Sequence, residues 1–458
     1  MEALKISEIA KALKIEAPCE GEILEICTDS RVAGLGSLFI AIEGEHLDGH
    51  DYIEKALERG ATCILAHKDG SWSADKVLRV KDTLRGLLDI ASYYRTKYTP
   101  HVIGITGSVG KTTTKDMVAA VLESGFTTIK TIGNQNNEIG APKTILSIDE
   151  NTQAAVIEMG MCGFGEIQDL AQAARPEIGV ITNIGVSHME LLGSRENILK
   201  AKLELANCLP DGATLFLCGD NDLLRNVKIP RLNVVFYGME NPDCQVRGEV
   251  TRSTPLNTWF TIHWQGKNWQ ACIPGCGNHL VQNALVAFAI GVTLGLPADK
   301  AVEALKNYVP SGMRQKVVEA GGVTVVEDCY NASPDSMVAA IKTLSAFPKT
   351  GRKILVLSDM LELGDISKQS HYDVGVYAAK SGVDTLLAFG EEGAQYVKGA
   401  SESGLKDARW FEQKSEVAPA IISILQQGDL IWFKASRAMK LEDVLEEVYK
   451  GLQISLQQ

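Results

Sequence analysis

Residues 104–115, GITGSVGKTTTK, form the segment with the clearest capacity for chemistry. They follow an apolar stretch typical of a strand and precede a stretch typical of a helix, which is the setting of a phosphate-binding loop. Glycines in the segment let backbone N–H groups approach phosphate oxygens, and the helix adds its positive end. Lys111 offers a charge for the terminal phosphates, and Thr112 offers a hydroxyl for Mg²⁺. The pattern predicts a nucleotide site formed by Gly107, Ser108, Val109, Gly110, Lys111, Thr112 and Thr113.

The loop departs from the usual phosphate-loop pattern at one position. Ile105 stands where the first glycine is usual and Gly104 lies one residue earlier, so the motif is a variant, TGSxGKTT. The alternative is a glycine-rich turn before a helix, but Lys111, Thr112 and the strand–loop–helix setting favour nucleotide binding. Such loops serve motors, switches, kinases and ligases alike, so other residues must indicate the reaction.

Polar residues also follow the next strands expected along the chain. Glu158 closes the run AAVIE, where a carboxylate can complete a magnesium site with Thr112 and the phosphates. Asn183 and His188 lie just past the following run, and Lys202 lies in the helix after it. Each alone has an ordinary alternative: a solvated strand end, a structural histidine or a surface lysine. Their combination on successive strands of one sheet predicts a metal site beside the nucleotide.

Short apolar runs alternate with amphipathic stretches from residue 101 onward, which predicts parallel strands joined by helices in an α/β domain. Its expected strands are 101–106, 154–159, 178–182 and 213–217. Its expected helices are 111–124, 164–174 and 194–208. The region 228–275 carries Trp259, Trp264 and Trp269 among alternating polar residues, and antiparallel strands are expected there.

The alternation resumes after Pro310 and predicts a second α/β domain. Its expected strands are 323–328, 353–360, 384–390 and 429–435, and its expected helices are 335–347, 367–380, 415–427 and 437–450. The first 85 residues differ, with short strands near 38–42 and 62–66 and helices near 6–14 and 51–59. Three domains are therefore expected, at residues 1–85, 86–311 and 312–458.

The composition, 45% hydrophobic and 22% charged, is that of a soluble globular protein. There are 45 basic and 57 acidic residues, and a formal charge of −12 argues against a general nucleic-acid binder. The first 16 residues lack the apolar core of a signal peptide, and no stretch has the length of a membrane span. Ten scattered cysteines indicate reduced thiols, and Cys272, Cys276 and His279 lack a fourth metal ligand, which favours loop and core roles. We expect a cytoplasmic protein without membrane insertion.

Several motifs resemble the Mur ligases, the amide ligases that build peptidoglycan, and the resemblance covers nearly the whole chain. Residues 28–61 look like that family's UDP-sugar-binding domain, and residues 181–205 and 311–337 are similar to its later motifs. The segments TIGNQNNEIGAP, YNASPDS and DMLELG are most specific to the ligase that adds D-alanyl-D-alanine to a UDP-linked muramoyl tripeptide. The resemblance implies a small N-terminal α/β domain for the UDP-linked substrate, a central P-loop ATPase domain with a parallel sheet, and a C-terminal Rossmann-like domain.

The resemblance also implies roles for single residues. The ATP contacts beyond the phosphate loop would be Asn283, Arg314 and Asp328. The ligands of two Mg²⁺ ions would include Thr112, Glu158, His188 and an N-carboxylated Lys202, whose carbamate has two anionic oxygens. The groups acting in catalysis would be Lys111, His188 and Lys202. The substrate contacts would be Ser30, Arg31, Asn134, Asn136 and Asn137. The sequence departs from the family pattern at Leu280, Ser333, Ser358 and Ala435. None of these departures removes a residue expected to bind phosphate or metal, or the expected lysine.

The implied activity is an ATP-dependent amide ligation. A carboxylate is a poor acylating group, so phosphoryl transfer from ATP would first make an acyl phosphate, which the amine of the dipeptide then attacks. The implied partners are these small-molecule substrates, and we expect a monomer. A folylpolyglutamate synthetase, another Mur ligase step and, from a different class, a P-loop switch remain alternatives.

Overall fold

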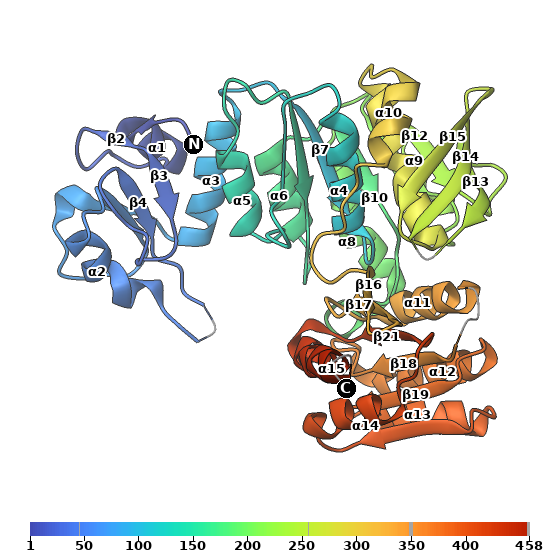
Figure 1. Cartoon of the computed structure of the whole chain (residues 1–458). Helices are drawn as coiled ribbons and strands as arrows, with labels where there is room; N and C mark the ends of the chain where they lie inside the picture. Colours follow the sequence, from blue (N-terminus) through green and yellow to red (C-terminus); the bar gives the residue numbers. More distant parts are fainter. Residues whose placement is uncertain (45, 255, 348–350, 456–458) are drawn as a thin grey trace. The chain divides into compact units, whose positions relative to one another are not determined.

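The computed structural model describes residues 1–44, 46–254, 256–347 and 351–455 (Figure 1). The chain separates into two compact units. Unit 1 comprises Met1–Ile105, Phe126–Gly179 and Glu204–Ala213, and unit 2 comprises Thr106–Gly125, Val180–Leu203 and Thr214–Gln458. Within the described ranges, no helix has both the length and the apolar character needed to cross a membrane.

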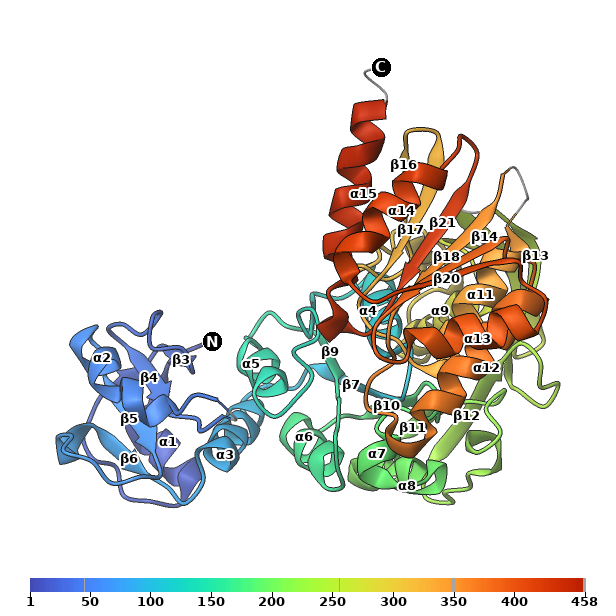
Figure 2. The ribbon, with the colours of Figure 1, turned by 90° about the horizontal axis from the view of Figure 1, so that it is seen from below.

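The N-terminal part of unit 1 is built on a parallel sheet in the order β3-β4-β5-β6. The strands are β3 (Glu25–Cys27), β4 (Ser37–Ile40), β5 (Cys63–Ala66) and β6 (Val77–Arg79). The helix α2 (Ile53–Glu58) packs its Ile53 and Ala56 into one apolar core with Phe39 and Ile64 of the sheet (Figure 2). The helices α1 (Ile6–Leu13) and α3 (Thr83–Arg95) complete this part, together with the two-residue strands β1 (Leu4–Lys5) and β2 (Glu22–Ile23). The predicted strands and helices of this region are confirmed.

A nine-stranded sheet follows in the order β15-β14-β13-β12-β11-β10-β7-β9-β8. Its strands are β7 (His101–Thr106), β8 (Thr128–Lys130), β9 (Ala154–Glu158), β10 (Ile178–Ile181), β11 (Thr214–Cys218), β12 (Asn233–Gly238), β13 (Val246–Ser253), β14 (Asn257–Trp264) and β15 (Lys267–Pro274). The four strands predicted between residues 101 and 217 are confirmed. They are almost entirely buried because parallel strands in α/β domains are covered on both faces.

The prediction of antiparallel strands for 228–275 is wrong for the first of them. Strand β12 pairs in parallel with both β11 and β13, whereas β14 pairs antiparallel with β13 and with β15. The hairpin between β14 and β15 turns at Gln265 and Gly266, whose φ angles of 50° and 73° are both positive. Such a turn matches the twist of an antiparallel pair, whereas β12 has no tight turn to reverse it and alternating polarity does not reveal strand direction.

Several helices accompany these strands, and the three that were predicted, at 111–124, 164–174 and 194–208, are confirmed. The helices are α4 (Lys111–Leu122), α5 (Gly140–Leu146), α6 (Glu166–Ala174), α7 (Met189–Leu192), α8 (Arg195–Cys208), α9 (Asn278–Thr293) and α10 (Ala298–Leu305). The helix α4 begins directly at Lys111, after Gly110 in a left-handed conformation with a φ of 85°. The strand–loop–helix setting predicted for the phosphate loop is therefore confirmed.

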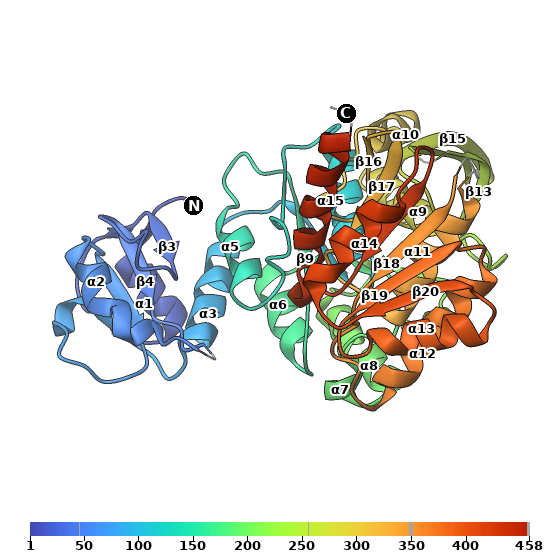
Figure 3. The same cartoon turned by 60° about the horizontal axis from the view of Figure 1, so that its bottom comes forward.

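The C-terminal sheet of unit 2 has the order β16-β17-β21-β18-β19-β20, parallel except for β16. Its strands are β16 (Lys316–Ala320), β17 (Val323–Asp328), β18 (Lys353–Leu357), β19 (Thr385–Phe389), β20 (Asp407–Phe411) and β21 (Leu430–Lys434). One apolar core lies under α11 (Pro334–Ala346), α12 (Ser367–Lys380) and α13 (Gly393–Glu402), and a second lies under α14 (Val417–Ile424) and α15 (Leu441–Ser455) (Figure 3). A sheet with helices on both faces confirms the predicted α/β class.

No element was predicted at the positions of α13, β16 or β20. In α13, Gly399 lies so close to α12 that a Cβ would come within 2.1 Å of the Tyr372 carbonyl oxygen. In α12, a Cβ on Gly375 would come within 2.0 Å of the Tyr396 carbonyl oxygen. Glycine disfavours a helix in isolation, so the close packing of the two backbones, which sequence propensity does not register, accounts for α13.

Candidate active site

The phosphate loop in unit 2 has a backbone that only glycine can adopt at its first position. Gly107 has a φ of 149°, and a Cβ there would lie 1.9 Å from Thr182 Oγ1. The Thr182 hydroxyl in turn donates to the Val109 carbonyl oxygen over 2.6 Å. The loop is therefore packed tightly against the residues that follow β10. This packing holds the loop backbone in the shape whose N–H groups can bind phosphate.

Asn183 accepts hydrogen bonds from the backbone of the same loop. The Ser108 N–H donates to the Asn183 carbonyl oxygen over 3.0 Å, and the Val109 N–H donates to Asn183 Oδ1 over 2.7 Å. The Ser108 hydroxyl accepts a 2.9 Å hydrogen bond from the Gly185 N–H. These contacts fix the loop before any ligand arrives. The sequence placed Asn183 near the site but did not predict its role.

Two lysines of unit 2 share this region. Lys111 Nζ lies over its own loop, donating to the Gly107 carbonyl oxygen over 2.7 Å and more weakly to that of Ser108 over 3.4 Å. Lys202 is only 1% exposed, and burial lowers the pKa of its amine well below the usual range, with the charge of Lys111 lowering it further. Because only the neutral amine reacts with carbon dioxide, this environment suits the carboxylation expected for Lys202.

His188 stands at the start of α7 in a left-handed conformation with a φ of 64°. Its Nδ1 lies 2.9 Å from the Glu362 carboxylate. The hydrogen bond with His188 lowers the pKa of Glu362, although partial burial opposes this effect. A residue of the segment DMLELG is thus the partner of the predicted histidine, and this partner was not predicted.

Asn283 and the two C-terminal candidates also lie in unit 2. Asn283 Oδ1 accepts from the Thr114 hydroxyl over 3.1 Å and approaches Gly110 of the phosphate loop. Arg314 stacks on the ring of Tyr330 at 3.6 Å. Its guanidinium also donates to the Ser311 carbonyl oxygen. Asn283 is thus held against the loop, and Arg314 presents a flat cation.

Asp328 forms a buried ion pair in which Lys434 Nζ lies 2.8 Å from Asp328 Oδ2. Burial raises the pKa of Asp328, while Lys434 opposes the rise. The ammonium also donates to the Asn331 carbonyl oxygen over 3.1 Å. Lys434 therefore ties the end of β17 to the start of the YNASPDS segment, a connection that the sequence did not indicate.

Glu158 lies in unit 1 at the end of β9 and is only 1% exposed. Its Oε1 accepts a 2.7 Å hydrogen bond from the side-chain amide of Asn136. The neighbouring Asn137 instead accepts the Gly140 N–H with its Oδ1 over 2.9 Å, at the start of α5. Asn134 is exposed. The three asparagines predicted to contact substrate thus have three different surroundings.

The N-terminal candidates lie in a loop of unit 1. Arg31 forms a bidentate pair with Asp29, at 3.0 Å from Nε to Oδ1 and 2.7 Å from Nη2 to Oδ2. This hydrogen bonding lowers the pKa of Asp29 to about 2. Ser30, which lies between these two residues in the sequence, is buried, whereas the Arg31 side chain is 83% exposed. The exposed guanidinium is therefore oriented by Asp29 and accessible.

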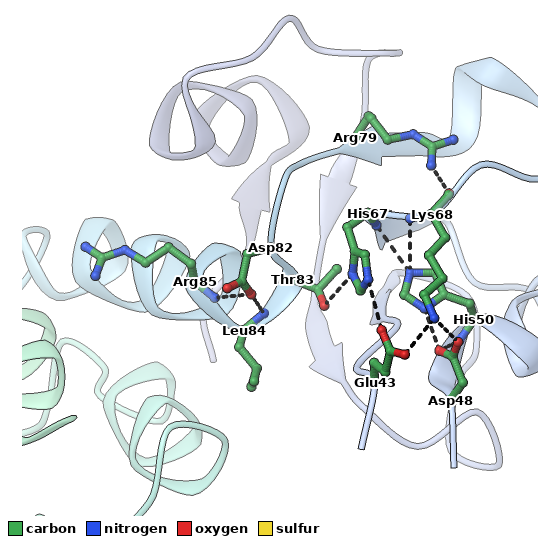
Figure 4. A network of polar contacts seen from close by, with 10 residues as sticks. All are labelled: Glu43, Asp48, His50, His67, Lys68, Arg79, Asp82, Thr83, Leu84 and Arg85. Atoms are coloured by element: carbon green, nitrogen blue, oxygen red, sulfur yellow. Dashed lines mark hydrogen bonds and ion pairs between the residues drawn. The ribbon is translucent and has the colours of Figure 1, made fainter. Parts of the chain in front are cut away.

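A second polar network lies in the same part of unit 1 (Figure 4). Burial would raise the pKa of Asp48, but hydrogen bonds from Lys68 at 2.6 Å and from His50 lower it overall. His50 Nδ1 lies 2.6 Å from Asp48 Oδ1, and its Nε2 accepts the backbone N–H groups of His67 and Lys68. The Asp48-Gly49-His50 motif therefore links the loop before α2 to the segment after β5.

The expected magnesium can be tested against the donors present. Among the described residues, no group of three or more His, Cys, Asp or Glu side chains could hold a metal by itself. A Mg²⁺ ion bound through nucleotide phosphates needs only one or two protein ligands and prefers oxygen. In unit 2 the Thr112 hydroxyl, in the first turn of α4, is a donor of that kind, and in unit 1 the buried Glu158 carboxylate is another. Each donor, taken by itself, is of a type that suits an ion whose remaining ligands are phosphate oxygens.

Comparison with known proteins places the chain in a family. Three family models match it: Mur ligase family, catalytic domain, at residues 22–94; Mur ligase middle domain, at residues 105–291; and Mur ligase, glutamate ligase domain, at residues 313–437. The UDP-N-acetylmuramoyl-tripeptide–D-alanyl-D-alanine ligase of Bacillus subtilis (strain 168) is 39% identical, with 97% of this chain and 98% of the relative covered. The chain belongs to the Mur ligase family.

Other relatives of this Mur ligase agree. The Escherichia coli (strain K12) protein of the same name is 31% identical, with 93% of this chain and 94% of the relative covered. A crystal structure of MurF from Acinetobacter baumannii has a TM-score of 0.91 at 27% identity, covering 98% of this chain and 99% of that one. MurF from Thermotoga maritima, in complex with ADP, has a TM-score of 0.86 at 28% identity, covering 94% and 98%. These neighbours share the whole α/β architecture of the chain.

Proposed function

We propose that this Mur ligase joins D-alanyl-D-alanine to a UDP-N-acetylmuramoyl tripeptide at the expense of ATP. The observation that carries the proposal is the preformed phosphate loop, with Lys111 at its helix start, in a chain whose relatives along nearly its full length are named for this reaction. The MurF neighbour that binds ADP supports the choice of nucleotide. The motifs at residues 131–142 and 330–336 resemble most specifically the ligase that adds D-alanyl-D-alanine, so they favour this step over other Mur ligase steps.

The chemistry needs an activated carboxyl group. A carboxylate oxygen of the tripeptide attacks the γ-phosphorus of ATP, ADP leaves, and an acyl phosphate forms. The free amine of D-alanyl-D-alanine then attacks the acyl carbon, phosphate leaves and the amide bond is complete. The first step brings two anions together, and in the second, as the amine gives up a proton, negative charge develops on the acyl oxygen and the leaving phosphate. Stabilisation of that charge is therefore the main task of the protein.

The residues of the loop would perform this task. Its backbone N–H groups and the start of α4 would bind the phosphates, and Lys111, now resting on the carbonyl oxygens of the loop, would turn to them. Asn283, Arg314 and Asp328 would contact the rest of ATP. Ser30, Arg31, Asn134, Asn136 and Asn137 remain the proposed substrate contacts. Arg31 has the exposed, oriented guanidinium that suits an anionic ligand.

Mg²⁺ would neutralise part of the phosphate charge when bound. Thr112 and Glu158 are its proposed ligands, with His188 and a carboxylated Lys202 proposed for a second ion. The burial of the Lys202 amine, which lowers its pKa, is what supports its modification. We also propose a cytoplasmic monomer whose domains are residues 1–85, 86–311 and 312–458.

The deciding experiment supplies the purified chain with ATP, Mg²⁺, UDP-N-acetylmuramoyl tripeptide and D-alanyl-D-alanine, and detects the pentapeptide product by mass. We expect a product that depends on all four components. Release of ADP with no joined product would refute the proposal. Replacing the tripeptide with a folate and glutamate tests the folylpolyglutamate synthetase alternative, and ATP turnover without either acceptor would favour a P-loop switch.

A further inference from the structure

Asn136 has a geometry unlike that of the other asparagines in its loop. Its side-chain amide donates to Glu158 Oε1 over 2.7 Å. Its backbone carbonyl oxygen accepts the Gly160 N–H over 2.7 Å. A Cβ on Gly160 would lie 2.8 Å from Asn136 Oδ1, so the side chain fits closely against the backbone beyond β9. Asn136 is therefore attached to the strand end both at Glu158 and two residues after it.

The same loop holds Glu158 at a second point. The Thr131 hydroxyl accepts the Glu158 N–H over 3.0 Å. Residues 131–136 thus fix both the backbone and the carboxylate of a glutamate that is only 1% exposed. All these residues belong to unit 1, so the arrangement depends on no contact with unit 2.

The chemical type of the donor matters. The terminal torsion of a glutamate is broad, so a carboxylate without a fixed partner rotates among many orientations. An amide N–H removes this freedom by engaging one oxygen. Because the amide is neutral, it places no positive charge of its own beside the carboxylate, whereas a lysine or arginine in its place would. Partners of this kind orient metal ligands in many sites.

We infer that Asn136 is a positioning residue that fixes the orientation of the Glu158 carboxylate for the Mg²⁺ accompanying the nucleotide. The inference rests on the proposed function, in which Glu158 is a ligand of that ion. In this role Asn136 acts through Glu158, which replaces for this one residue the contact with the tripeptide proposed above.

The test measures metal affinity directly. Mn²⁺ replaces Mg²⁺ as a paramagnetic probe, and its dissociation constant with the ADP-bound chain is read by electron paramagnetic resonance. We expect Asn136→Ala to weaken Mn²⁺ binding roughly 10-fold, as removal of such partners typically does. In the ligation assay, the KM for Mg²⁺ should rise by a similar factor, while kcat recovers at high Mg²⁺. Asn136→Ser is a second variant, which keeps a small polar side chain in case Asn136→Ala does not fold. Thermal unfolding of each variant is recorded to show that it is folded.

The adjacent asparagine offers a matched control. Asn137→Ala removes the acceptor of the Gly140 N–H at the start of α5, so it should lower stability by about 1 kcal/mol while the Mn²⁺ dissociation constant stays unchanged. An equal loss of Mn²⁺ affinity in both variants would overturn the inference by indicating a general loosening of the loop.

Other results would overturn it in different ways. If Asn136→Ala left Mn²⁺ affinity unchanged but raised the KM for the tripeptide, Asn136 would be a substrate contact. If the wild-type chain with ADP bound no Mn²⁺, there would be no ion to position. Ligation itself is followed separately through the mass of the pentapeptide, so failure of this inference is distinguishable from failure of the proposed function.

Discussion

At the scale of single residues, the site contains two lysines whose amines have different surroundings. Lys111 donates to carbonyl oxygens of its own loop, and anionic phosphate oxygens are stronger acceptors for its ammonium group. Lys202 is buried, and this burial lowers the pKa of its amine well below the usual range, with the charge of Lys111 lowering it further. Two lysines of the same unit are thus prepared for different chemistry by their environments.

The first prediction concerns Lys111. Lys111→Ala removes the charge that would meet the terminal phosphates, so the ligation rate should fall roughly 100- to 1,000-fold, the usual loss when one charge-stabilising group is removed. Because the side chain is only partly buried, the fold should persist. Product formation is measured by mass, and circular dichroism checks the fold. A variant with undiminished ligation would show that the phosphates bind elsewhere.

The second prediction concerns Lys202. Lys202→Met keeps the volume of the buried chain but removes the amine, so ligation should be lost while the protein stays folded. With ¹³C-labelled bicarbonate, the wild-type chain should show a carbamate carbon signal by NMR that the variant lacks. The control is Lys200→Ala, which changes an exposed lysine of the same helix and should leave activity intact. Full activity of Lys202→Met would remove the carbamate proposal.

At the scale of elements, the phosphate loop depends on close approach of two backbones. We predict that Gly107→Ala abolishes nucleotide binding, because a Cβ would lie 1.9 Å from Thr182 Oγ1 and a φ of 149° disfavours alanine. Binding of a fluorescent ATP analogue, followed by its anisotropy, measures the loss.

Gly212 provides the control for that variant. Its φ is 79°, also in the left-handed region, yet no heavy atom lies within 4 Å of the position of its Cβ. Gly212→Ala should therefore lower stability by about 1 kcal/mol without changing nucleotide affinity. Equal nucleotide affinity in the two glycine variants would mean that contact with Thr182 does not shape the loop.

Several elements were predictable because local sequence determines them. Apolar runs bounded by polar residues located β7, β9, β10 and β11, and the glycine-lysine pattern located the start of α4. The direction of β12 and the existence of α13 depend on partners distant in sequence, so they were not predictable. The same limit applied in the site: the type of Asn136 was informative, but its bond to a carboxylate 22 residues away was not visible in the sequence.

At the scale of the whole molecule, stability should depend on pH through a histidine outside the proposed chemistry. His279 in α9 contacts Gln315 Oε1 through Nε2 at 3.1 Å. Burial lowers the pKa of His279 to about 4, although the hydrogen bond with Gln315 opposes the effect. The folded state therefore keeps this ring neutral at a pH where the unfolded chain, with a pKa of about 6.5, is protonated.

The sign of the effect follows from proton binding. As pH falls from 7.5 to 5, the unfolded state takes up a proton that the folded state does not, so the free energy of unfolding should decrease, by about 2 kcal/mol from this residue. His279→Gln should lose this part of the acid sensitivity, as measured by urea unfolding at both pH values. His46→Gln, which changes an exposed histidine, should retain it. Equal acid destabilisation in the wild-type chain and in His279→Gln would show that the His279 ring is already protonated in the folded state at pH 5, and that other groups govern the acid response.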